Sequence, residues 1–291
     1  MERRQFIRIA AAGAGLVAVL PARDILGAEL IHGRRKRFPM RGDVKKPDAV
    51  RMLAGSLEAY RPPERSWPVD GGTAVVYDLV DFTAVPHYRK PKPGQPLSTN
   101  GILGQIALRR VPGAPSYEVR QVYSPWEGAE EELRATIQCH DDQLNSISDY
   151  DLTWSCRKTN PLITYQRSRS GRMDNGRLDV RVDGRTRSYQ TSGRLTALWT
   201  MFDAVRRLPA RVEQPERFAM LTDLVSLRRK QELVFDGAGE VNCAAGAVPV
   251  RFYRQLGEGI TPIHYAIDER QRTLWVTQGQ LGWALNRIGE S

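Results

Sequence analysis

Residues 173–190 read MDNGRLDVRVDGRTRSYQ and contain two tight-turn signals on either side of one short strand. Asp174-Asn175-Gly176 and Asp183-Gly184 supply residues that tolerate positive φ, as tight hairpins require. Strands joined by links this short must be antiparallel neighbours, because a parallel crossover needs a dozen or more residues. The stretch therefore predicts a β-meander, in which each strand pairs with the next one along the chain.

Further turn signals follow this stretch along the chain. Gly257-Glu258-Gly259 and Asp268-Glu269 are further turn signals, and Asp236-Gly237 is also predicted to turn the chain. The predicted strands between such turns are 73–80, 104–111, 117–123, 132–140, 150–157, 162–169, 176–182, 185–191, 226–235, 247–256, 261–267, 272–278 and 281–287. We therefore predict a mainly β domain over residues 73–291, an antiparallel meander that forms an open barrel or half-barrel.

One helix is predicted inside the meander, over residues 194–208. Its apolar residues recur at helical spacing and Pro209 ends the run. They are Leu195, Leu198, Trp199, Phe202 and Val205. A single apolar helix within a sheet protein is expected to pack on the concave face of the sheet.

The N-terminus carries an export signature. Arg3-Arg4-Gln5-Phe6-Ile7-Arg8 precedes an apolar run of 12 residues that Pro21 interrupts, too short for the roughly 20 residues of a spanning helix. It resembles the twin-arginine (Tat) signal, in which Arg3, Arg4 and Phe6 fill the defining places. The resemblance implies a signal peptide over residues 1–28, the Tat translocase as a partner, and a periplasmic or otherwise exported protein. Residues 29–72 are predicted to be a basic linker and a short helix over 46–60.

Composition narrows the classes of partner. The chain has 291 residues, a formal net charge of +10 and a mean hydropathy of −0.45, so we expect it to be soluble after export. A basic exported protein can meet anionic lipid headgroups, acidic glycans or wall polymers. Nucleic acid is not expected in that compartment. The alternative is that the arginines are scattered over the surface without a specific partner.

The cysteines leave two alternatives open. If strands 132–140 and 150–157 form a hairpin centred near Ile147-Ser148, then Cys139 lies opposite Cys156 on the buried face, within disulfide range. The other reading is that both are buried free thiols. Cys243 has no partner in either case.

Motifs for catalysis and metal binding are missing from the sequence. HExxH, CxxCH and GxSxG do not occur, so we expect no cofactor, metal or catalytic residue. His140-Asp141-Asp142 would be half of a metal site or simply a solvated turn. Glu127 and Glu130-Glu131-Glu132 would supply one carboxylate of a glycosidase or belong to a charged loop.

Four aromatic residues are candidates for lining an apolar pocket. Trp154, Trp199, Phe202 and Trp275 occur in strongly apolar patterns. They form the core if the barrel is filled, and line a pocket if the meander curls around the helix without filling its interior.

The order of these elements resembles a known group. The helix ends in Leu208-Pro209, and the strands after it include VPVRFY at 248–253, YAID at 265–268 and TLWV at 273–276. Residues 130–288 resemble uncharacterised bacterial exported β-meander proteins shaped like the half-barrels of periplasmic lipoprotein carriers. The resemblance implies a non-enzymatic envelope protein that binds an apolar or amphiphilic ligand such as a lipid. The alternatives are a carboxylate-dependent enzyme acting on envelope glycans and an interaction protein with an arginine-rich surface.

Overall fold

The described part of the chain forms one sheet of fifteen strands and one helix, α3, in a computed structural model. Described are residues 57–68, 71–81, 102–123, 129–158, 165–191, 193–209, 214–222, 224 and 226–289. The strands are β1 Ala74–Asp81, β2 Ile102–Arg110, β3 Ser116–Tyr123, β4 Ala129–Cys139, β5 Ile147–Lys158, β6 Tyr165–Asp174, β7 Arg177–Val182, β8 Arg185–Gln190, β9 Leu195–Ala197, β10 Glu216–Thr222, β11 Ser226–Cys243, β12 Gly246–Leu256, β13 Ile263–Asp268, β14 Thr273–Gln278 and β15 Leu281–Ile288.

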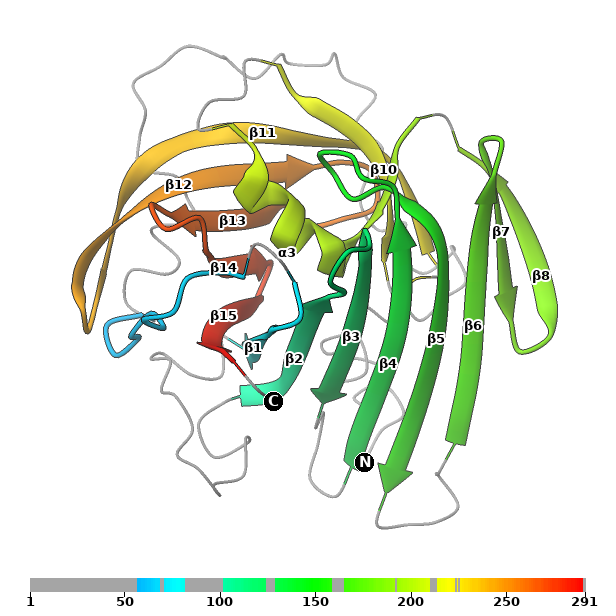
Figure 1. Cartoon of the computed structure of the whole chain (residues 1–291), viewed down its shortest axis with the longest axis horizontal. Coiled ribbons are helices and arrows are strands. Elements are labelled where there is room, and N and C mark those ends of the chain that lie inside the picture. Colours follow the sequence, from blue (N-terminus) through cyan, green and yellow to red (C-terminus); the bar gives the residue numbers. More distant parts are fainter. Residues whose placement is uncertain are drawn as a thin grey trace, which may run out of the picture.

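The chain enters this sheet in the middle. β1 pairs with β2 on one side and with β15 on the other, β2 to β8 follow outward to one edge, and β9 starts the opposite edge. Gln190 and Leu195 are five residues apart and hence no more than about 18 Å from each other. The two edges therefore approach each other without pairing, and the sheet curls into an open barrel (Figure 1). The predicted mainly β, antiparallel, open fold is confirmed.

The two predicted tight turns have the expected geometry. Asn175 and Gly176 have φ values of 47° and 78°, and Asp183 and Gly184 have 48° and 81°. Two consecutive positive φ values are typical of the type I′ turn, whose twist matches that of the flanking strands. They connect β6 to β7 and β7 to β8.

Three features of the sheet differ from the prediction. Asp236-Gly237 does not turn the chain but lies inside β11, where the register shifts between Phe235 and Gly237, and glycine adopts the φ of 124° that this bulge needs. β10 was not predicted. β4 begins at Ala129, so Glu130–Glu132 belong to a strand rather than to a loop.

The helix α3 spans Leu198–Arg207 and packs against the concave face, as predicted (Figure 1). Its start differs from the predicted residue 194, because Leu195–Ala197 form β9 and pair in parallel with β10. Those backbone hydrogen bonds replace the first turn that the apolar spacing had suggested. Phe202 is fully buried, and its ring lies 5.0 Å from that of Tyr77 and 5.8 Å from that of Trp283.

The segment 57–68 packs against β14 and β15. Leu57, Tyr60 and Trp67 are buried, and the Tyr60 hydroxyl donates a hydrogen bond to the Leu285 carbonyl at 2.9 Å. The Tyr60 ring lies 5.1 Å from that of Trp275. Of the predicted helix 46–60, only the last four residues are described, and they form a turn. The signal peptide, residues 1–28, and residues 29–56 of the predicted linker and helix segment lie outside the described residues.

Of the two alternatives for Cys139 and Cys156, the structure has the free thiols and not the disulfide, because the β4–β5 hairpin has another register than the disulfide requires. Cys139 lies opposite Ile147, and Cys156 lies opposite Glu131. Since Cys156 follows Ile147 by nine residues on an extended strand, the two cysteines are about 30 Å apart. All three cysteines are free thiols, and burial raises the pKa of Cys139 to about 12.

Candidate functional site

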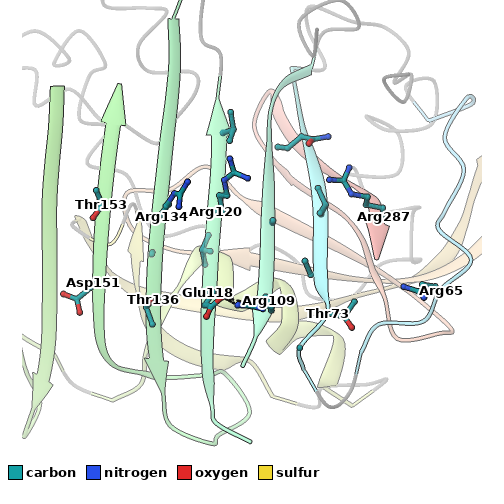
Figure 2. A pocket seen from close by; sticks show the side chains of 18 residues that line it. Arg65, Thr73, Arg109, Glu118, Arg120, Arg134, Thr136, Asp151, Thr153 and Arg287 are labelled. Carbon is teal, nitrogen blue, oxygen red and sulfur yellow. Dashed lines mark hydrogen bonds and ion pairs between the residues drawn. The ribbon is translucent and has the colours of Figure 1, made fainter. Parts of the chain in front are cut away.

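A groove crosses the outer face of strands β1 to β5, opposite the face that packs on α3. Tyr77 contacts Phe202 on the concave side, and its neighbour Val76 lines the groove, because successive residues of a strand point to opposite faces. The groove has a volume of about 1140 Å³. We call it the arginine groove, after Arg65, Arg109, Arg120, Arg134 and Arg287 (Figure 2).

The strand register arranges the lining side chains in two rows. The first, here named the arginine row, crosses from β15 to β5 through Arg287, Val76, Ala107, Arg120, Arg134 and Thr153, each residue opposite the next. The second row runs beside it through Ala74, Arg109, Glu118, Thr136 and Asp151. Side chains from six strands thus converge on one surface.

The middle of the arginine row carries short side chains, which form the floor of the groove there. Val76 and Ala107 are small, and they separate Arg287 from Arg120 by three strand spacings, or about 14 Å. Arginine side chains are far longer than valine or alanine, so they form two cationic poles with a shallow apolar floor between them. Val76 is 1 % exposed and Ala107 is partly exposed, so a ligand that reaches a guanidinium at each end contacts this floor mainly at Ala107.

Positive charge dominates the groove because carboxylates are fewer than guanidinium groups. Arg109 is paired with Glu118, its Nε donating at 2.9 Å. One oxygen of Glu132 accepts hydrogen bonds from both Arg120, at 2.7 Å, and Arg134, at 2.8 Å. These contacts lower the pKa of Glu132, so its carboxylate stays ionised and is shared between two cations.

Two of the groove arginines have no carboxylate partner within the part of the chain that the structure describes. Neither Arg65 nor Arg287 forms an ion pair with a carboxylate among residues 57–289 that the structure describes. Like charges opposite each other across a strand pair, as at Arg120 and Arg134, are destabilising. Arginines without a carboxylate partner and arginines that lie next to each other both fit a surface that binds an anion.

A buried hydrogen-bond network holds one polar side chain of the groove in place. Gln105 donates a hydrogen bond from its amide nitrogen to Asp78 at 2.7 Å. Asp78 is fully buried and also accepts hydrogen bonds from Asn286 at 2.9 Å. This buried network holds the Gln105 amide in one orientation beside the arginine row.

Two carboxylates lie in the second row, Glu118 and Asp151. They are two strand spacings apart, about 10 Å between backbones, near the separation of the two carboxyl groups in inverting glycosidases. Glu118 is paired with Arg109, and Asp151 is exposed. The row therefore supplies charge and hydrogen-bonding groups to the groove.

The motif His140-Asp141-Asp142 serves the β4–β5 turn. One oxygen of Asp142 accepts hydrogen bonds from the backbone N–H groups of Leu144, at 3.1 Å, and Ser146, at 2.8 Å. No group of three or more histidine, cysteine, aspartate or glutamate side chains placed to hold a metal occurs within the described residues. No helix of that same part of the chain is long and apolar enough to cross a membrane.

The four aromatic candidates do not meet in one place. Trp199, Phe202 and Trp275 are 0–5 % exposed and belong to the hydrophobic core around α3. Trp154 lies on β5, edge-on to Tyr165 at 5.4 Å between ring centroids. Trp199, Phe202 and Trp275 are therefore core residues.

A buried ionic cluster joins α3 to β3. Asp203 is 1 % exposed and accepts hydrogen bonds from the Tyr117 hydroxyl at 2.6 Å and from Arg206 Nε at 2.7 Å. Burial, and then the Asp203 charge, raise the pKa of Tyr117 well above its usual value. The Arg206 guanidinium lies 4.9 Å from the centre of the Trp67 ring. The cluster fixes the helix to the sheet that carries the groove.

Sequence reasoning missed the arginine groove. Arg109, Arg120 and Arg134 lie on strands with polar residues at alternating positions, which indicates a solvent-facing row on each strand. That alternation is a usable signal. The alignment of the rows depends on strand register, and the sequence alone did not provide it.

No protein-family model matches the chain, and no curated protein matches it either. Among solved structures, the chain is similar to the crystal structure of a β-barrel-like protein of domain of unknown function DUF1849 from Brucella abortus. The two are 10 % identical with a TM-score of 0.48, over 77 % of this chain and 98 % of that one.

Proposed function

We propose that this chain is an exported, non-enzymatic protein that binds an anionic ligand in the arginine groove. The observation that carries the proposal is the convergence of five arginines on one groove, against three carboxylates: Glu118, Asp151 and the Glu132 that Arg120 and Arg134 share. Guanidinium groups bind carboxylate and phosphate through paired, charge-assisted hydrogen bonds. Five of the 36 arginines of the chain line this groove.

The groove supports binding better than the concave face does. An apolar chain inside the barrel would need open space near α3, where Phe202, Tyr77 and Trp283 are in contact. In this proposal an amphiphilic ligand is held through its anionic group on the outer face.

Export through the Tat route is the second part of the proposal. It rests on Arg3, Arg4 and Phe6 of the sequence. Residues 1–28 fused to a reporter that is active only after export should direct it out of the cytoplasm. The pair of substitutions Arg3→Lys and Arg4→Lys should abolish this, and unchanged export would contradict the Tat assignment.

The binding proposal is tested with a short linear inorganic polyphosphate, a general polyanion probe. Isothermal titration calorimetry compares the wild type with the triple variant Arg120→Gln, Arg134→Gln, Arg287→Gln. We expect the variant to lose at least about tenfold in affinity, since a tenfold change needs only about 1.4 kcal/mol. Circular dichroism and the thermal midpoint verify that the variant is folded.

A matched control removes the same charge elsewhere. Arg177→Gln, Arg217→Gln and Arg229→Gln change three exposed arginines that do not line the groove. We expect this variant to bind within about threefold of the wild type, because exposed charges beyond a Debye length of ~10 Å are screened. Equal losses in the two variants would show that only overall charge matters and would overturn the proposal.

A further inference from the structure

We infer that the ligand of the arginine groove is a linear anionic glycan that lies across the strands along the arginine row. The inference rests on the proposed function and specifies its ligand class. It follows from three properties of the lining: its extent, its lack of aromatic rings among described residues, and the spacing of its cationic poles.

The extent of the groove fits a chain better than a compact molecule. Small-molecule pockets enclose about 300–1,000 Å³ and bury most of their ligand. The arginine groove is larger, about 1140 Å³, and crosses the sheet from β15 to β5 over five strand spacings, or about 24 Å. An extended ligand can contact the whole arginine row at once.

The chemistry of the lining fits a sugar chain better than a nucleic acid or a lipid. Single-stranded nucleic acid is usually held by aromatic rings that stack on the bases, and none of the described lining residues is aromatic. Of the apolar floor residues, Val76 is 1 % exposed and Ala107 only partly exposed, so the floor presents little apolar surface to an acyl chain. Thr136, Thr153 and Gln105 instead place hydroxyl and amide groups between the arginines, as hydrogen-bonding partners for sugar hydroxyls.

The spacing of the arginines predicts a dependence on ligand length. Arg120 and Arg134 are neighbours, one strand spacing or about 4.8 Å apart, and share the Glu132 carboxylate. Arg287 lies about 14 Å from Arg120 across the low floor. A short anion therefore occupies one pole, whereas only a longer chain bridges both.

The test is a length series of oligogalacturonates, from monomer to octamer, titrated by calorimetry at low and moderate salt. We expect the affinity to rise with length and then level off once the chain spans the row, with a loss of affinity at higher salt. Neutral maltooligosaccharides of the same lengths should not bind measurably. An affinity that does not depend on length would overturn the inference.

Two single variants locate the poles. Arg120→Gln should weaken short and long oligomers alike, by about tenfold, the equivalent of 1.4 kcal/mol. Arg287→Gln should weaken only those long enough to bridge, and Arg217→Gln, with its exposed side chain, serves as the control and should change neither. A uniform effect of Arg287→Gln on all lengths would contradict the bridging geometry.

Two further probes separate failure of this inference from failure of the proposed function. If polyphosphate binds and depends on the groove arginines while oligogalacturonates do not bind, the anion site stands and the glycan class is wrong. If vesicles of anionic phospholipid bind in a groove-dependent way and oligogalacturonates do not, the ligand is a lipid headgroup. If no probe depends on the groove arginines, both proposals are wrong.

Discussion

Substituting Asp203 by alanine is predicted to destabilise the protein strongly. The Asp203 carboxylate accepts hydrogen bonds from Tyr117 and from Arg206, and Arg207 lies 3.4 Å from it. The side chains of Asp203 and Arg206 are 1 % and 7 % exposed. Asp203→Ala therefore leaves a buried guanidinium without its counter-ion and a buried tyrosine hydroxyl without its acceptor.

The expected magnitude follows from this geometry. Removing one partner of a buried ion pair costs about 3–5 kcal/mol, because the remaining charge is left uncompensated. For a chain of this size, each kcal/mol lowers the thermal midpoint by roughly 2–4 °C, so the midpoint should fall by roughly 6–20 °C. Arg206 cannot easily turn toward solvent, since it packs over the Trp67 ring at 4.9 Å.

The assay is urea unfolding followed by tryptophan fluorescence, with differential scanning calorimetry for the midpoint. Asp179→Ala is the matched control, because Asp179 also pairs with an arginine, Arg177 at 2.9 Å, but its side chain is 43 % exposed. We expect the control to unfold at the wild-type midpoint. Equal midpoints for Asp203→Ala and the wild type would refute the claim that this cluster fixes α3 to the sheet.

Three further predictions test other parts of the structure. In the native protein, iodoacetamide should label Cys243 first. In denaturant without reductant it should label all three cysteines, and two unlabelled cysteines would reveal a disulfide. Gly171→Ala places a Cβ 2.2 Å from the Tyr150 ring and should cost about 1–3 kcal/mol in urea unfolding, whereas Gly239→Ala, with its nearest contact at 3.8 Å, should be far milder. Burial raises the pKa of Tyr265 and of other buried tyrosines. The stability that these neutral tyrosines contribute is therefore fully present below about pH 10 and is lost as the pH rises further. The urea midpoint should accordingly fall between about pH 10 and pH 11.5. A midpoint that does not change over this range would contradict the prediction.

The sequence predicted the meander well where turns are short and chemically marked. Asn175-Gly176 and Asp183-Gly184 specify both the turn type and the register of the strands that they join, because a two-residue loop leaves no freedom to slip. The same reasoning wrongly predicted a turn at Asp236-Gly237, because a glycine with positive φ also occurs in a bulge inside a strand.

The β4–β5 hairpin shows the limit of that logic. Its connection, 140–146, is shaped by Asp142 accepting two backbone hydrogen bonds, which the sequence pattern did not reveal. The true centre of the hairpin lies four residues before the predicted one, so the register slips by an even number of residues. An even slip keeps every side chain on its face. Cys139 and Cys156 are therefore both buried, as predicted, and yet far apart.

The arginine groove could not be predicted because it depends on long-range closure. Arg287 lies opposite Val76 although more than two hundred residues separate them in the chain. The alignment of Arg120 with Arg134 depends on the β3–β4 register, and that of Ala107 with Arg120 on β2–β3. Local patterns give the face of each side chain but not its neighbour on the next strand.

The central claim, that an anion binds in the arginine groove, is tested most directly by arginine footprinting. The protein is treated with phenylglyoxal, with and without short polyphosphate, and modification is read by mass spectrometry of peptides. We predict that polyphosphate protects Arg120, Arg134 and Arg287, while Arg177 and Arg217 react at the same rate in both samples. Protection spread equally over all five arginines, or absent from the groove, would contradict the account.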